Sequence, residues 1–149
     1  MSDLASRADV DALLRRFYGQ ALHDDVLYEP FTELRDGGLE AHLPVMCDFW
    51  ETVLFRAGLY KGSAMTVHRQ LHALHPLHAG HFVRWLTLWA ATVDDMFSGP
   101  NADRAVVQAA RVAWAMNRHV TGADAADLTA LATKLQDAHP PRNMDVRDM

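Results

Sequence analysis

The chain has 149 residues, half of them hydrophobic and 22% charged, which predicts one globular domain over residues 1–149. Alanine and leucine fill 41 positions, against 12 valines and no isoleucine, so the composition favours an all-α fold. The net charge of −5 argues against a basic surface of the kind that binds nucleic acid or anionic lipid.

Three further features bear on the cellular compartment of the protein and on membrane insertion. The single cysteine, Cys47, cannot form an internal disulfide and is interpreted as a small buried apolar side chain. The opening of the chain carries Asp3, Arg7 and Asp9 where a signal peptide needs an apolar core. The longest stretch without Asp, Glu, Lys or Arg, residues 70–83, is too short to span a bilayer. We therefore expect a cytoplasmic protein with no membrane segment.

The first part of the chain predicts two long helices joined by a connector. Apolar residues at helical spacing predict an amphipathic helix over residues 9–25. Residues 26–38 contain Pro30 and end in a glycine pair, which indicates a connector with one short helical turn. A helical period then continues over residues 39–57, where Pro44 is tolerated only near the first turn.

The rest of the chain predicts a loop and three more helices. Residues 61–77 are interpreted as a loop that holds one short helix. A long apolar helix is predicted over residues 78–97, and Asn101 is expected to cap the helix that follows it. A small helix is predicted over about residues 124–137, with a disordered tail after about residue 138.

Histidine is concentrated in one segment. Five of the nine histidines lie within 14 positions, namely His68, His72, His75, His78 and His81. His68 and His72 could share a helical face and bind zinc with His75 or His78, or one histidine alone could be an axial ligand of haem. A solvated polar loop is the third interpretation. The zinc site has no support elsewhere, because the sequence lacks a cysteine pair and a glutamate placed as in zincins.

The aromatic residues shift the balance between these interpretations. Most of them are explained as core residues on the apolar faces of the predicted helices. Tyr18 and Trp85, however, each bring a polar hydrogen to such a face, and buried groups of this kind normally have a hydrogen-bond partner. The predicted helices offer few acceptors.

Five segments occur together in a consistent order over about residues 9–119: Phe17-Tyr18, HLPVMCDFW (42–50), YKG (60–62), MTVHRQL (65–71) and HFVRWLTLW (81–89). Together they resemble the group III truncated haemoglobins. The resemblance implies an all-α, truncated globin-like two-on-two helical sandwich around haem b, with the small C-terminal helix as an addition.

The resemblance also implies roles for individual residues. His68 matches the proximal iron ligand, which binds through Nε2 while its other ring nitrogen donates to a backbone carbonyl. Tyr18 and Trp85 match the distal donors to a ligand on iron, His42 matches the position that gates entry, and Met46 matches a wall of the pocket. The side chains expected to line the haem pocket or to pack behind it are Phe31, Phe49, Trp50, Leu71 and Phe82. The candidate partners of the haem propionates are Tyr60, Lys61 and Arg69.

These residues predict a haem protein that binds diatomic gases such as O2, NO and CO. Two distal donors favour retention of O2 for redox chemistry over O2 transport. NO dioxygenation and a peroxidase-like reaction both suit such a site, and either would need a separate reductase, because the chain has no flavin or dinucleotide signature. The alternative is a helical interaction or sensory module whose histidine-rich loop binds a metal ion or is inert.

Overall fold

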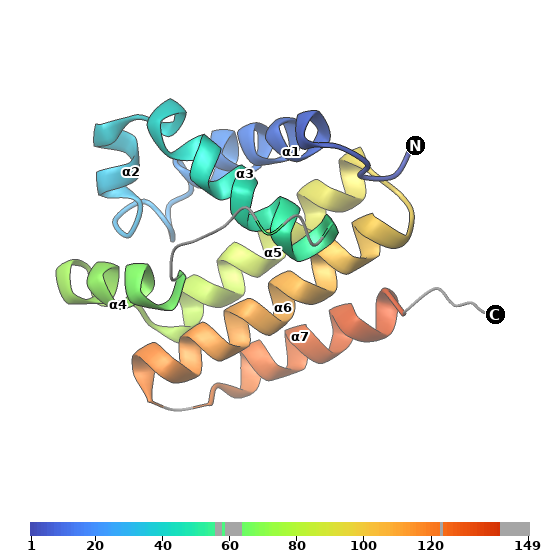
Figure 1. Cartoon of the computed structure of the whole chain (residues 1–149). Helices are drawn as coiled ribbons and strands as arrows, with labels where there is room; N and C mark the ends of the chain where they lie inside the picture. The colour runs from blue at the N-terminus through green and yellow to red at the C-terminus, as the bar shows by residue number, and fades with distance from the viewer. Residues whose placement is uncertain (56–57, 59–63, 123, 141–149) are drawn as a thin grey trace.

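The computed structural model describes residues 1–55, 58, 64–122 and 124–140, and these residues form an all-helical fold without a β-strand (Figure 1). The helices in chain order are α1 (Arg7–Ala21), α2 (Thr32–Gly37), α3 (Leu39–Phe55), α4 (Ala64–Leu74), α5 (Ala79–Met96), α6 (Pro100–Thr121) and α7 (Ala126–Ala138). The predicted all-α class is thus confirmed. Within the described ranges, no helix has both the length and the apolar character needed to cross a bilayer.

Two pairs of helices form the centre of the molecule. Helix α1 packs on α3, α5 packs on α6, and the pairs meet through α1 against α5 and α3 against α6 (Figure 1). Helix α7 covers α5 and α6, while α2 packs on α3 and α4 packs on α6. The core therefore lies between the α1–α3 pair and the α5–α6 pair, with α4 at one end of the molecule.

Local interactions explain where α1 begins and ends. The Ser6 hydroxyl accepts a hydrogen bond from the Asp9 N–H, so the helix starts before the predicted residue 9. The predicted helix continued to residue 25, but α1 ends at Ala21. The reason is a turn in which the Asp24 carboxylate accepts the N–H groups of Val26 and Leu27.

The start of α6 differs from the prediction. Asn101 was expected to be the N-cap, but the helix begins at Pro100 and Gly99 occupies the cap position. The first N–H groups are capped instead by the carboxylate of Asp3, which accepts from Asn101 at 3.0 Å and from Ala102 at 2.8 Å. A residue from the beginning of the chain thus replaces the local cap.

Two more predictions concern Pro44 and the end of the chain. Pro44 lies inside α3 rather than in its first turn, on an exposed position whose carbonyl accepts from the Arg7 guanidinium. The predicted small C-terminal helix is α7, where Leu128 and Ala132 are buried. The predicted tail lies mostly outside the described residues, and within them His139 is bonded to Asp94 of α5 at 3.2 Å.

Candidate functional site

An aromatic cluster brings the two expected distal donors together. The ring of Phe17 meets the rings of Tyr18 and Trp85 edge to face, with centroids 4.9 and 6.0 Å apart. Tyr18 also meets Phe31 at 5.7 Å, which links α1 to the segment that leads into α2. The cluster arises because the helical period of α1 buries Phe17 between α3 and α5, so that its neighbour Tyr18 lies at the edge of the core.

Neither donor has a partner in the described part of the chain. The Tyr18 hydroxyl and the Trp85 indole N–H make no hydrogen bond there, although both residues pack against the core. In contrast, the indole of Trp89, one turn after Trp85, donates to the carbonyl oxygen of Ala105 at 3.1 Å. Burial raises the pKa of Tyr18 to about 12, so the phenol stays protonated and remains a donor at neutral pH.

One ring nitrogen of His68 makes a hydrogen bond, and the other makes none to the described residues. Its Nδ1 lies 2.7 Å from the carbonyl oxygen of Ala64, one turn earlier on α4. This bond requires the proton on Nδ1, because a carbonyl oxygen only accepts. Nε2 then carries the lone pair, and it makes no hydrogen bond among the described residues. This is the arrangement of a histidine that can bind a metal through Nε2.

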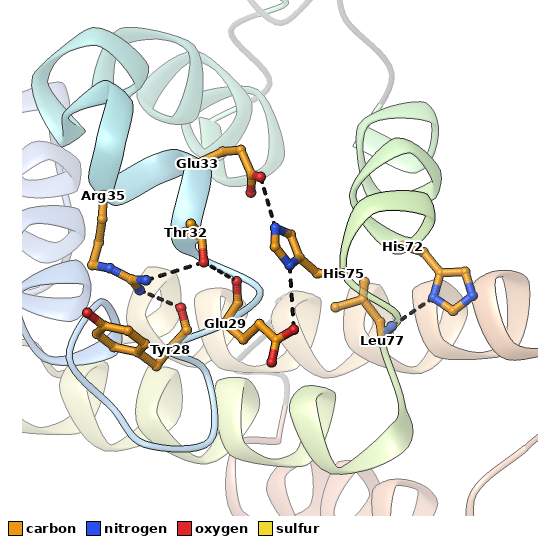
Figure 2. A network of polar contacts seen from close by, with 8 residues as sticks. All are labelled: Tyr28, Glu29, Thr32, Glu33, Arg35, His72, His75 and Leu77. Atoms are coloured by element: carbon orange, nitrogen blue, oxygen red, sulfur yellow. Dashed lines mark hydrogen bonds and ion pairs between the residues drawn. The ribbon is translucent and has the colours of Figure 1, made fainter.

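The other histidines of this segment have structural contacts, and Figure 2 shows those of His72 and His75. The His72 Nδ1 accepts the N–H of Leu77 at 2.8 Å and so holds the turn that follows α4. The His75 Nε2 lies 2.8 Å from Glu33 of α2, and Glu29 is 3.8 Å from its Nδ1. The hydrogen bond to Glu33 raises the pKa of His75.

The last two histidines of the segment belong to the start of α5. The rings of His78 and His81 stack with centroids 3.8 Å apart, and the His81 Nδ1 accepts the N–H of His78 at 3.1 Å. Burial lowers the pKa of His81, which keeps this acceptor neutral. In the ranges that the structure describes, no three His, Cys, Asp or Glu side chains form a group that could hold a metal ion.

The remaining expected pocket residues have different degrees of burial. His42 is exposed on α3, and Met46, one turn later, is partly buried against the core. Of the expected lining residues, the buried ones are Trp50 and Phe82, and the partly buried ones are Phe31, Phe49 and Leu71. Among the described residues, no hydrogen bond or ring contact joins His68 to Tyr18 or Trp85, so the expected iron ligand and the expected distal donors form separate groups.

The candidate propionate partners are placed only in part. Tyr60 and Lys61 lie outside the described residues. The exposed Arg69 follows His68 on α4, and its Nε donates to the Nε2 of His119 on α6 at 2.6 Å. Arg69 therefore ties α4 to α6, an interaction that the sequence did not reveal because the partners are 50 positions apart.

Cys47 has the environment expected from the sequence. It is a buried free cysteine on α3, 2% exposed, and burial raises the pKa of its thiol. A thiol of this kind stays protonated and is a poor nucleophile. Cys47 is therefore a core residue and has no place in the candidate site.

The sequence did not predict a stack of three tryptophan rings that includes Trp85. The rings of Trp50, Trp89 and Trp85 stack in sequence, Trp50 on Trp89 at 4.4 Å and Trp89 on Trp85 at 5.8 Å. The spacing of Trp85 and Trp89, four residues apart, indicates a shared helix face. It carries no information on the position of Trp50, which comes from α3.

Comparisons of the chain with protein-family models, with curated proteins and with solved structures found no match. The chemistry of the site is therefore argued from its own residues. They supply one imidazole nitrogen and two N–H or O–H donors, none of which makes a hydrogen bond within the described ranges. His68 could hold a prosthetic group that takes one histidine nitrogen from the protein, and Tyr18 and Trp85 could donate to a negatively charged ligand of that group.

Proposed function

We propose that the chain binds haem b through the Nε2 of His68 and that Tyr18 and Trp85 face the opposite side of the haem. The observation that carries the proposal is the hydrogen bond from the His68 Nδ1 to the Ala64 carbonyl, 2.7 Å long. It orients the imidazole, fixes the tautomer that has a free Nε2, and makes that nitrogen a stronger ligand. Haem when bound supplies an iron that takes up O2, NO or CO and exchanges electrons.

The distal donors define what the site does with a gas ligand. O2 would carry partial negative charge when the haem takes it up, and the Tyr18 O–H and the Trp85 N–H would be its donors, since neither makes a hydrogen bond to the described residues. Hydrogen bonds to a charged acceptor contribute roughly 1.5–3 kcal/mol each. Two such bonds slow the release of O2, which suits redox chemistry and does not suit transport.

NO dioxygenation and a peroxidase-like reaction are the two reaction classes that we propose. In both, electron density moves onto oxygen, and donors that are already oriented stabilise this charge without reorganisation. Phe17 orients them, because it packs edge to face against both aromatic rings. Electrons would come from a separate reductase.

The helix arrangement supports the finer fold that we propose, a truncated globin-like two-on-two sandwich. The α1–α3 and α5–α6 pairs would be its two layers, and the distal donors come from one layer each, Tyr18 from α1 and Trp85 from α5. Helix α4 would be the short helix that carries the proximal ligand. Exposed His42 on α3 would lie at the entrance to the distal side.

A visible absorption spectrum tests the proposal. The full chain, purified from cells supplied with a haem precursor, is expected to show a Soret band that CO shifts in the reduced protein. Absence of the band after reconstitution with haem would refute haem binding. It would leave the alternative, a helical interaction or sensory module, which the structural contacts of His72, His75, His78 and His81 favour.

A further inference from the structure

Three tryptophans form a continuous stack across the two helix pairs. The rings of Trp85 and Trp89 on α5 are nearly parallel, with an angle of 9° and centroids 5.8 Å apart. Trp89 in turn stacks on Trp50 of α3 at 4.4 Å and 19°. Phe17 meets Trp85 and Trp89 edge to face at 6.0 and 5.1 Å, which holds both rings in place. The stack thus runs from a distal donor of the candidate site to the opposite helix pair.

The chemistry of this stack goes beyond packing. Tryptophan is one of the side chains most easily oxidised by one electron, and near-parallel rings in contact allow an electron to move between them. Trp89 is 1% exposed and its N–H is held by the Ala105 carbonyl, which is too weak a base to take the proton. An oxidised Trp89 therefore keeps its proton and is readily reduced again, which is what an intermediate carrier requires.

The two ends of the stack differ from its centre. The indole N–H groups of Trp85 and Trp50 make no hydrogen bond to the described residues, Trp85 is half-buried, and Trp50 retains 6% exposure. Loss of the indole proton to water converts a tryptophan radical cation into a neutral radical. The hole can thus be trapped at either end of the stack, and Trp50 is the end far from the gas-binding side.

We infer that Trp85, Trp89 and Trp50 form an electron-transfer path that supplies an electron to the haem site during reaction with hydrogen peroxide. The inference rests on the proposed function. Reduction of one H2O2 to two waters consumes two protons and two electrons. The haem, when bound, would supply one electron and be restored by the separate reductase, and Trp85 would supply the other. Trp89 then reduces Trp85, Trp50 reduces Trp89, and Trp50 loses its indole proton. A small-molecule one-electron donor restores Trp50.

Spin trapping with residue mapping tests the path. The haem-loaded protein is mixed with H2O2 and a nitroso spin trap, and peptide mass spectrometry locates the adduct. We expect adducts on both Trp50 and Trp85 in the wild-type protein. Trp89→Phe interrupts the stack, because phenylalanine is much harder to oxidise, and is expected to lose the Trp50 adduct and to keep the one on Trp85. Trp114→Phe, which changes an exposed tryptophan outside the stack, is expected to match the wild type.

The outcomes separate this path from the proposed function. Two outcomes with a normal Soret band overturn the path alone. One is an undiminished Trp50 adduct in Trp89→Phe, and the other is the absence of a Trp50 adduct in the wild-type protein. A protein without a Soret band overturns both. Trp50→Phe gives a second test if Trp89→Phe does not fold. Labelling of Trp85 is expected to rise in this variant, and unchanged Trp85 labelling would contradict the path.

Discussion

The Nδ1 of His68 lies 2.7 Å from the carbonyl oxygen of Ala64, so the imidazole of His68 is oriented by its own helix. Since this carbonyl lies one turn earlier, the orientation of the ring depends on α4 being helical between the two residues. The bond needs no residue from another element. The candidate ligand is therefore oriented as soon as α4 forms.

His68→Ala is expected to lose most of its haem, because the proposed site has one protein ligand to the iron. His72→Ala, one turn later, is expected to keep the wild-type spectrum, since its Nδ1 only caps the turn at Leu77. The Soret absorbance relative to protein checks both variants, and added imidazole should restore haem to His68→Ala. Equal haem content in the two variants would refute the assignment.

Trp85→Phe is expected to release O2 roughly ten to a hundred times faster, since the lost hydrogen bond is worth about 1.5–3 kcal/mol. CO dissociation should change far less, because CO held by iron carries little charge. Stopped-flow measurements on the reduced protein check both rates. Unchanged O2 release would mean that the indole N–H does not face the ligand.

Tyr18→Phe tests the second donor, and the double variant tests their coupling. Tyr18 and Trp85 are held by the same ring, Phe17, and would share one acceptor. Groups in one hydrogen-bond network are not additive. The double variant should therefore differ from the sum of the single effects on O2 release. Strict additivity would place the two donors at independent sites.

The contact between His75 and Glu33 predicts a pH-dependent stability. Their hydrogen bond raises the pKa of His75 and lowers the pKa of Glu33. The contribution of His75 to the stability of the folded protein is complete below the pKa of His75 in the unfolded chain, and it is lost as the pH rises through the pKa in the folded protein. The contribution of Glu33 is complete above the pKa of Glu33 in the unfolded chain, and it is lost as the pH falls through the pKa in the folded protein. The pair thus stabilises the folded protein most between about pH 4.3 and pH 6.5.

Glu33→Gln should therefore lower the melting temperature more at about pH 5.5 than at about pH 8.5. Glu40→Gln is the matched control. Glu40 pairs with Arg15, whose guanidinium stays protonated, so its effect should be the same at both pH values. A Glu33→Gln effect that does not vary with pH would show that His75 and Glu33 are not coupled.

The cap of α6 predicts a stability effect at the start of the chain. Asp3→Ala removes the acceptor of the Asn101 and Ala102 N–H groups and should cost about 1 kcal/mol in the free energy of unfolding. Gly99→Ala should cost more. The φ angle of Gly99 is 147°, and an added Cβ would lie 2.5 Å from the Asp3 Cγ.

Urea denaturation checks these variants, and Asp3→Asn is the control because its amide oxygen can still accept one N–H. It should fall between the wild type and Asp3→Ala. Wild-type stability in Gly99→Ala would contradict the close contact with Asp3.

Helices with a strong apolar period were well predicted from the sequence. Residues 78–97 were expected to be helical, and α5 covers Ala79–Met96, because Phe82, Leu86 and Val93 recur on one face and are all buried. The predicted cap of α6 was wrong, since the cap comes from Asp3, 98 positions away from Asn101. Sequence spacing carries only local signals, so a cap of this kind cannot be read from it.

The same distinction applies to the candidate site. The bond between His68 and Ala64 spans one helical turn and follows an expectation drawn from the chemistry of ligating histidines. The contacts of Tyr18 and Trp85 with Phe17 depend on how α1 packs against α5. Only the family resemblance led us to expect the two donors in one pocket. The stack of Trp50 on Trp89 depends on α3 as well, and nothing in the order of residues indicated it.

Both ends of the described chain are hydrogen-bonded to residues at the C-terminal end of α5. The Ser98 N–H donates to the Ser2 carbonyl at 3.0 Å, and His139 is bonded to Asp94 at 3.2 Å, both at the C-terminal end of α5 (Figure 1). Helix α4 adjoins the other end of α5, about 27 Å away at 1.5 Å per residue. A dye, an affinity tag or another domain attached before Ser2 would thus lie a whole helix length from α4, and a new N-terminal fusion should leave His68 and its helix undisturbed.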